Sequence, residues 1–379
     1  MATIVCLVAL DVAVRSLTTS TASAAARSCA SLLIPRFLIS PCATLTPPRV
    51  SKWRTALPDR VRVGFVGAGR LAARVHYPSL AAMPDVDLVA IAELDEGRLT
   101  SLADRYHVRG RYADYRAMLE HETLDAVYVI MPPQFLFDIA VDALTRSKHL
   151  FIEKPPGVTT YQTQALAWHA SNHGCHTMVG FNRRFVPLLV RARELVTARG
   201  PIHLCQAAFH KHEASADQFG FYRGAASHLT SDIIHAVDTL RWFAGGEAVA
   251  VASDNRAVGM PFPNSHNALI AFDSGCTGIL TATRHGGARR HTFELHGEHI
   301  SVYSDDQHHA AVYADGLEEP QRLSAAELAG SDEGRVRFGY FHESRHFIDC
   351  VKAGVSPATN FADAAKTMGL LDRIVAAQI

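Results

Sequence analysis

The 379-residue chain has little lysine, no C-x-x-C pair, no long apolar run and no net charge. With 37 Lys+Arg against 37 Asp+Glu, it offers no basic surplus for a nucleic-acid partner. No apolar run approaches the roughly 20 residues needed to cross a bilayer, so no membrane partner is expected. The scattered cysteines indicate neither a disulfide scaffold nor a zinc site, and we expect no metal. What remains is a globular composition of two-domain length.

The first 58 residues differ in composition from the rest. They are rich in Ser, Thr and Ala and contain one acid, Asp11. Their basic residues are Arg15, Arg27, Arg36, Arg49, Lys52 and Arg54. Such a segment is typical of an organelle transit peptide, and a start codon assigned too far upstream would look the same. We expect a disordered leader over 1–58 and a cytoplasmic protein, with domains at 59–181 and 182–360 and a last helix at 361–379 that packs back on the fold.

A glycine-rich motif follows the first expected strand, 62–66. The residues Gly67-Ala68-Gly69-Arg70-Leu71-Ala72 form G-x-G-x-x-A and open a helical stretch over 71–83. Gly67 suits a tight turn, and Gly69 lets the backbone approach a pyrophosphate. The start of the helix, at Arg70 and Leu71, offers unpaired N–H groups to phosphates. The motif predicts a dinucleotide site, with an ordinary glycine turn as the alternative.

The next expected strand, 87–92, ends in Glu93. An acid at this position accepts the ribose hydroxyls of NAD and repels the extra phosphate of NADP. A solvated loop acid is the alternative. We therefore expect NAD as the cofactor, with NADP as the second choice.

Strands and helices continue to alternate up to residue 181. The expected helices are 96–106, 115–120, 135–146 and 161–172, and the expected strands are 126–131, 149–152 and 176–181. Pro132 and Pro133 stop one strand, and Glu153 and Lys154 follow another, where carboxyl ends face a cofactor. Thr159 and Gln162 form a capping box. This order indicates an α/β fold with a doubly wound, parallel Rossmann sheet.

The second half contains short segments of strand composition. They lie at 202–210, 248–253, 267–272, 278–284, 292–296, 300–304 and 310–314. Turn residues such as Asp273-Ser274-Gly275 and Gly286-Gly287 separate them. The pattern predicts an α+β domain with an open, mostly antiparallel sheet.

A series of motifs runs in order through residues 60–379. They are Val66-Gly67-Ala68-Gly69, Val75-His76-Tyr77-Pro78, Pro132-Pro133, and the segments 148–155, 179–185, 235–242 and 343–349. Together they resemble the glucose–fructose oxidoreductase/inositol dehydrogenase/rhizopine-catabolism (Gfo/Idh/MocA) oxidoreductases. The resemblance implies a Rossmann domain in which Glu-Lys-Pro ends a strand, and a second domain that completes the active site. It also implies a homo-oligomer formed through the C-terminal sheet.

The expected reaction centre contains Lys154 and His235. Lys154 can hydrogen-bond the substrate oxygen whose carbon gives or receives a hydride, with Glu153 beside it; a surface ion pair is the alternative. His235 resembles the family's catalytic histidine, and its ordinary pKa near neutrality suits a proton acceptor. Typical members carry Asp where Ser231 stands, a departure from the pattern. Asp232 follows directly and is expected to reach the imidazole.

Arg184, Tyr222 and Ser231 are expected to bind substrate, with a solvated rim as the alternative. The resemblance implies an NAD(P)-dependent dehydrogenase that acts on a secondary alcohol of a sugar, cyclitol or sugar derivative. Two alternatives stay open: a glycoside-cleaving enzyme that oxidises C3 transiently, and a non-catalytic NAD or sugar sensor.

Overall fold

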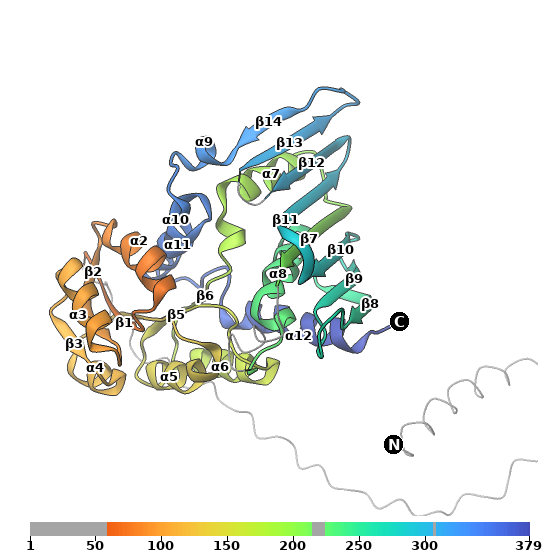
Figure 1. Ribbon diagram of the computed structural model, residues 1–379. Helices are drawn as coiled ribbons and strands as arrows, with labels where there is room; N and C mark the ends of the chain where they lie inside the picture. Colours follow the sequence, from red (N-terminus) through yellow and green to blue (C-terminus); the bar gives the residue numbers. More distant parts are fainter. Residues whose placement is uncertain (1–58, 214–223, 306–307) are drawn as a thin grey trace, which may run out of the picture. The chain divides into compact units, whose positions relative to one another are not determined.

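The computed structural model describes residues 59–213, 224–305 and 308–379. The expected leader, 1–58, and Tyr222 lie outside the described residues. Two sheets organise the described chain, one built from its first part and one from its second (Figure 1). Each sheet agrees in type with the sequence prediction, since the first is parallel and the second mostly antiparallel.

The first sheet has six parallel strands in the order β3-β2-β1-β4-β5-β6. Their bounds are β1 Val61–Val66, β2 Val86–Ala92, β3 Gly110–Tyr112, β4 Ala126–Val129, β5 His149–Ile152 and β6 Thr177–Val179. The chain proceeds outward from β1 in one direction and then, from β4, in the other. This reversal creates a switch point beside β1, where ligands bind outside the carboxyl ends of the strands. The short strand β3 was not predicted from the sequence.

Helices connect the parallel strands. They are the π-helical turn η1 Ala72–His76 with α2 Tyr77–Ala81, then α3 Glu96–Arg105, α4 Tyr115–His121, α5 Pro133–Thr145 and α6 Thr160–Asn172. The N-cap half of the predicted capping box at α6 is confirmed, since Thr159 Oγ1 accepts from the Gln162 N–H at 3.2 Å. The return bond differs: Gln162 Oε1 accepts at 2.8 Å from the N–H of Val158, the residue before the N-cap. The local sequence therefore determines where this helix begins.

The second sheet has eight strands in the order β14-β13-β12-β11-β7-β10-β9-β8. Their bounds are β7 Leu204–His212, β8 Ala248–Arg256, β9 Ser265–Phe272, β10 Thr277–Thr283, β11 His285–Gly297, β12 Ile300–Asp305, β13 His309–Ala314 and β14 Gln321–Ser324. Neighbours are antiparallel except for β7 and β10. The prediction that Gly286-Gly287 forms a turn is wrong: these glycines lie within β11, where the register against β7 shifts between His285 and Arg290. A bulge can account for the glycines without ending the strand.

Helices cover one face of the second sheet (Figure 1). They include α7 Pro187–Thr197 and, after the π-helical turn η4 Leu229–Ile233, α8 Ile234–Ala244. The turn η2 Asn182–Phe185 leads into α7 from the first sheet. Side chains in β9 alternate between buried and less buried, and Leu269 on the uncovered side is 54% exposed. This alternation is expected of a sheet with one covered face.

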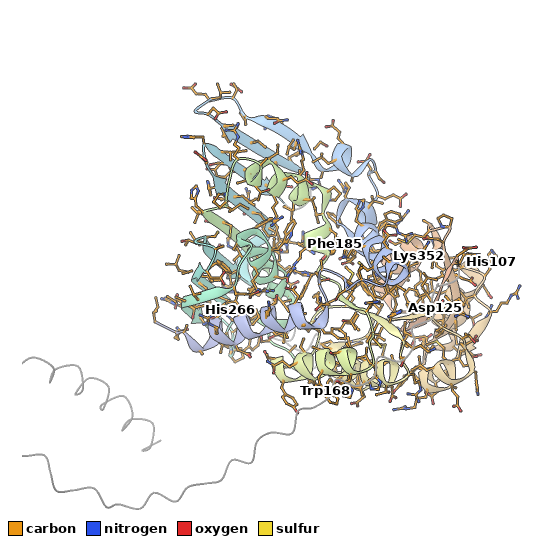
Figure 2. The ribbon with its side chains drawn as sticks, turned by 180° about the vertical axis from the view of Figure 1, so that it is seen from behind. His107, Asp125, Trp168, Phe185, His266 and Lys352 are labelled. Carbon is orange, nitrogen blue, oxygen red and sulfur yellow. The ribbon has the colours of Figure 1, made fainter. Side chains whose placement is uncertain are left out.

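The end of the chain returns to the first sheet. After α9 Ala325–Ala329 and α10 Gly334–Arg337, helix α11 Tyr340–Ala353 places Phe347 edge-on against Tyr128 and Phe151, with ring centroids 5.6 and 5.8 Å apart. Lys352 Nζ also pairs with Asp85 at 2.7 Å, and Figure 2 shows Lys352 on this helix beside the orange Rossmann segment. Within the range 182–360, which the sequence assigned to one substrate domain, α11 thus contributes an aromatic side chain to the core of the Rossmann sheet.

The predicted last helix is α12 Phe361–Ala376, which packs along α6 and α8 (Figure 1). The segment before it joins the edge of the first sheet, where the Val179 N–H donates to the Thr359 carbonyl at 2.8 Å. Among the described residues, no helix has the length and apolar character that would let it cross a membrane. Cys175, Cys205, Cys276 and Cys350 are free thiols.

Candidate active site

The glycine-rich loop lies at the carboxyl end of β1. Gly67 has φ +103°, and a Cβ there would lie 2.4 Å from the carbonyl oxygen of Ile130. No other residue type fits this position without strain. Gly69 differs, because within the described chain no atom comes within 4 Å of its Cβ position. The loop thus packs against the end of β4 at Gly67 and leaves open space at Gly69, as a bound pyrophosphate requires.

Glu93 holds the glycine-rich loop from the end of β2. Its Oε2 accepts from the Ala68 N–H at 2.7 Å, and its Oε1 accepts from the Asp95 N–H at 3.0 Å. The Arg98 guanidinium lies 3.3 Å from the same carboxylate. The carboxylate is thus held beside the loop, where a ribose would reach it.

The other expected cofactor residues lie at the same edge of the sheet. Arg70 and Leu71 are exposed where the helix after the loop begins. Pro132 is exposed at the N-cap of α5, and Pro133 is the first, buried residue of that helix. Both prolines follow β4, the neighbour of β1. Parallel strands bring these segments together because their carboxyl ends share one edge.

Lys154 joins the two halves of the chain. It follows β5, and its Nζ donates to the carbonyl oxygen of Ser231 at 2.7 Å. Burial lowers the pKa of the ammonium, although the negative charges of Asp232 and Glu153 oppose the shift. The bond occupies one of the three N–H donors of the ammonium, so two remain for other acceptors.

Ser231 contributes its backbone rather than its hydroxyl to this contact. It lies in η4, a π-helical turn at the start of α8. The helix after the glycine-rich loop also begins with a π-helical turn, η1. Such turns are rare and frequent at functional sites. Sequence periodicity gave no sign of either one.

His235 is buried one turn after Ser231, with 6% of the residue exposed. Burial and the positive charges of Arg183 and Lys154 lower the pKa of His235 well below its ordinary value. Its Nδ1 makes no hydrogen bond to any described residue. The imidazole is therefore neutral at pH 7 and has a free ring nitrogen. We call Lys154, Ser231 and His235 the reaction centre.

Asp232 does not make the expected contact with His235. Its Oδ2 accepts from Lys211 Nζ at 2.7 Å and from the Arg284 guanidinium at 2.6 Å. Although burial acts in the opposite direction, the charges of Arg284 and Lys211 hold the pKa of Asp232 well below its ordinary value. The physical reason for the correction is that two cations at the ends of β7 and β10 attract this carboxylate more strongly than a neutral imidazole would.

A cavity of about 820 Å³ lies beside the helix that follows the glycine-rich loop. Leu71 of the glycine-rich loop lines it, and so do Arg183, Arg289 and Tyr340. The positive charge of Arg183 also helps to lower the pKa of both Lys154 and His235, so one cavity-lining residue acts on the reaction centre.

Two protein-family domains match the sequence of this chain. An oxidoreductase family with an NAD-binding Rossmann fold matches residues 61–181, and the Gfo/Idh/MocA C-terminal domain matches residues 189–303. The chain belongs to the Gfo/Idh/MocA oxidoreductase family. The resemblance seen in the sequence motifs is thus confirmed, and NAD binding belongs to the family's description.

Several Gfo/Idh/MocA relatives are similar over most of their length. The chain is 25% identical to scyllo-inositol 2-dehydrogenase (NAD(+)) of Bacillus subtilis over 80% of this chain and 90% of that protein. It is 26% identical to D-xylose 1-dehydrogenase (NADP(+)) 2 of Haloferax volcanii over 82% of this chain and 95% of that protein. Among solved structures, GenD2 from gentamicin A biosynthesis, in complex with NAD, superposes with a TM-score of 0.70 at 26% identity, covering 84% and 94% of the two chains.

Two expected site residues of this Gfo/Idh/MocA protein have interior partners instead. The Arg184 guanidinium, 9% exposed, pairs with Asp238 at 2.6 Å and with Asp363 at 2.8 Å. Arg184 thus has two carboxylate partners, of which Asp238 is buried, and its binding of substrate stays a prediction. The adjacent Arg183 lines the cavity instead.

Glu153 is the second such residue. Its Oε1 lies 2.9 Å from His76 Nε2, and its Oε2 accepts from the Lys154 N–H at 3.1 Å. Only 7% of its side chain is exposed, so a cofactor contact is not supported. Sequence reasoning missed His76 and Glu343 as members of this cluster, although both stand in the motifs shared with the family.

Proposed function

We propose that the protein transfers a hydride between NAD and a secondary alcohol or ketone of a sugar, cyclitol or sugar derivative. The observation that carries the proposal is the 2.7 Å bond from Lys154 Nζ to the Ser231 carbonyl. This bond brings a lysine at the cofactor edge of β5 next to the helix that carries His235. Hydride transfer from an alcohol needs a cofactor and proton-handling groups in one place.

The cofactor residues fit a dinucleotide. Gly67 permits the turn, Gly69 leaves room for a pyrophosphate, and a helix N-terminus, which favours phosphate binding, follows directly. Glu93 supplies acceptors for ribose hydroxyls. When bound, NAD supplies the hydride acceptor at its nicotinamide ring.

Lys154 and His235 divide the handling of the proton. The two unoccupied N–H donors of Lys154 bind the substrate oxygen and stabilise the negative charge that develops there during oxidation. The bond to Ser231 orients these donors. His235, neutral because its pKa is lowered, accepts the hydroxyl proton at a ring nitrogen. Asp232 does not contact the reacting groups; its carboxylate balances the positive charges of Lys211 and Arg284.

The substrate class and the assembly are part of the proposal. Inositol and xylose dehydrogenases among the relatives support a polyol or sugar, and their names favour a dehydrogenase over a glycoside-cleaving or sensing protein. The exposed side chains Leu269 and Tyr303 on the uncovered face of the second sheet support a homo-oligomer formed there.

The test is a panel of sugars and inositols with NAD and with NADP, followed by Lys154→Met. Loss of the ammonium should lower kcat/KM by about 10²–10⁴-fold, because transition-state charge loses its donor. The dissociation constant for NAD, measured by calorimetry, should stay within a few fold. Lys366→Met is the matched control, since Lys366 is exposed and pairs with Glu247 at 3.0 Å on the surface. Full activity in Lys154→Met would contradict the proposal.

A further inference from the structure

Three titratable side chains from separate elements meet under Lys154. His76 comes from η1, Glu153 follows β5, and Glu343 lies in the first turns of α11. Ligand-type atoms of the three lie within 4.8 Å of one another. His76 and Glu343 are 0% exposed and Glu153 is 5% exposed. Two carboxyl groups are thus enclosed together in the interior.

The two carboxyl groups have unequal partners. Both oxygens of Glu153 accept hydrogen bonds, from His76 and from the Lys154 N–H. Neither oxygen of Glu343 has a hydrogen-bond partner among the described residues. An ionised carboxylate without donors is strongly disfavoured in the interior, and a second negative charge beside it adds repulsion.

The other charged and titratable groups around Glu343 do not remove this cost. Those that act on Glu343 or face it are Glu153, His76, Arg183 of η2, Tyr128 of β4 and Tyr340 of α11 itself. Burial and the charge of Glu153 raise the pKa of Glu343 well above its ordinary value, against the opposing charge of Arg183. Of these groups, Glu153 carries the negative charge that helps to raise the pKa of Glu343, and its carboxylate is an acceptor for the proton.

We propose that Glu343 is a neutral carboxylic acid in the native protein and that its O–H donates to the Glu153 carboxylate. One proton is then shared by the pair, and Glu153 accepts three hydrogen bonds instead of two. The arrangement leaves a single negative charge next to Lys154 rather than two.

Glu343 is thereby a positioning residue for Lys154. It holds Glu153, which in turn holds the backbone N–H of Lys154 at 3.1 Å. The positioning role rests on the proposed function of Lys154, whereas the protonation state does not. The two parts are therefore tested separately.

Infrared spectroscopy of the full chain at pH 7 tests the protonation state without any substrate. Wild type should show the carbonyl band of a protonated carboxyl group, and Glu343→Gln should lack it. Asp349→Asn is the matched control on the same helix, because Asp349 is 62% exposed and pairs with Arg345. The control should retain the band.

Two results would overturn the proposal. A wild-type spectrum without a protonated carboxyl band would show that both glutamates are ionised, and this result needs no variant to fold. One equivalent of a tightly bound divalent metal in wild type, lost in Glu343→Gln, would show that a cation rather than a proton balances the charges.

Kinetics with an active substrate test the positioning role. Glu343→Gln keeps a neutral donor and should retain kcat within about threefold. Glu343→Leu has no donor and should lower kcat by tenfold or more with KM for NAD unchanged. Equal kcat values in the two variants would overturn the positioning role, whatever the infrared result.

Discussion

Neighbouring residues in the site motifs contact different parts of the protein, because successive side chains leave the backbone in different directions. Glu153 turns inward to His76, and Lys154 turns to the helix that carries Ser231. Arg183 lines the cavity, whereas Arg184 is enclosed with Asp238. Sequence motifs identified these pairs but not the direction of each side chain, which depends on contacts from distant elements.

The first residue-scale prediction concerns Glu93. Glu93→Gln keeps an acceptor for the Ala68 N–H but removes the negative charge. Arg98, which lies 3.3 Å from the Glu93 carboxylate, is then released to bind the extra phosphate of NADP. The ratio of kcat/KM for NADP to that for NAD should rise by about tenfold. Glu96→Gln, at the exposed first turn of α3, is the control and should leave the ratio unchanged. An unchanged ratio in Glu93→Gln would contradict its role at the ribose.

The second residue-scale prediction concerns acid stability. Burial, with the charge of His228, lowers the pKa of His266 from 6.5 to about 4. The folded protein keeps this imidazole neutral while the unfolded chain protonates it, so its contribution is complete above pH 6.5 and is lost as pH falls toward 4. Between pH 7 and pH 5 the free energy of unfolding should fall by about 2 kcal/mol on this account.

Urea unfolding at the two pH values measures this effect. His266→Gln should flatten the pH dependence, and His121→Gln, on the exposed surface of α4, should not. Figure 2 shows His266 in the part of the molecule built around the second sheet, so a local effect on cofactor binding is not expected. An equal slope in wild type and His266→Gln would contradict the assignment.

At the scale of elements, patterns with a local physical cause were predictable. The strand before Gly67, the capping box of α6 and the last helix follow from neighbouring residues. The π-helical turns η1 and η4 and the bulge in β11 were not predictable, because they depend on tertiary contacts. The hydrogen bond from Lys154 to the Ser231 carbonyl could not be derived either, because a π-helical turn changes which backbone groups face a neighbouring element.

The glycine pair gives an element-scale prediction. Gly67→Ala should destabilise the protein and abolish NAD binding, because its Cβ would meet the Ile130 carbonyl at 2.4 Å and φ is +103°. Gly69→Ala should keep the melting temperature, since its Cβ meets no described atom within 4 Å, yet weaken NAD binding tenfold or more by occupying the pyrophosphate's space. Thermal melting and calorimetry measure the two effects. Normal NAD affinity in Gly69→Ala would contradict the loop's assignment.

At the scale of the whole molecule, the two sheets share a core to which α12 contributes, whereas α11 packs into a separate core of the first sheet. Phe347 is fully buried against the first sheet although it follows the second in the chain. The sequence predicted both sheets but not that α11 would cover the first one, because an amphipathic helix does not reveal which apolar surface it will cover.

The whole-molecule prediction is that the two sheets unfold together, even when the core of the first sheet alone is weakened. Phe347→Ala should lower the free energy of unfolding by about 3–5 kcal/mol, the usual cost of deleting a buried ring. Urea unfolding should remain a single transition, with circular dichroism and tryptophan fluorescence shifting together. Phe135→Ala is the control, since Phe135 is 51% exposed on α5 and should cost less than about 0.5 kcal/mol. Separate transitions for the two sheets would contradict a shared core.

The return of α11 also sets the order of events during synthesis. A ribosome adds roughly 5–20 residues per second, so roughly 10–35 s pass between residue 181, where the match to the Rossmann family ends, and residue 353, the end of α11. During that interval the aromatic face of Tyr128 and Phe151 has no cover from Phe347. The nascent first domain therefore presents an apolar surface that chaperones recognise, and slow translation of the second domain prolongs its risk of aggregation.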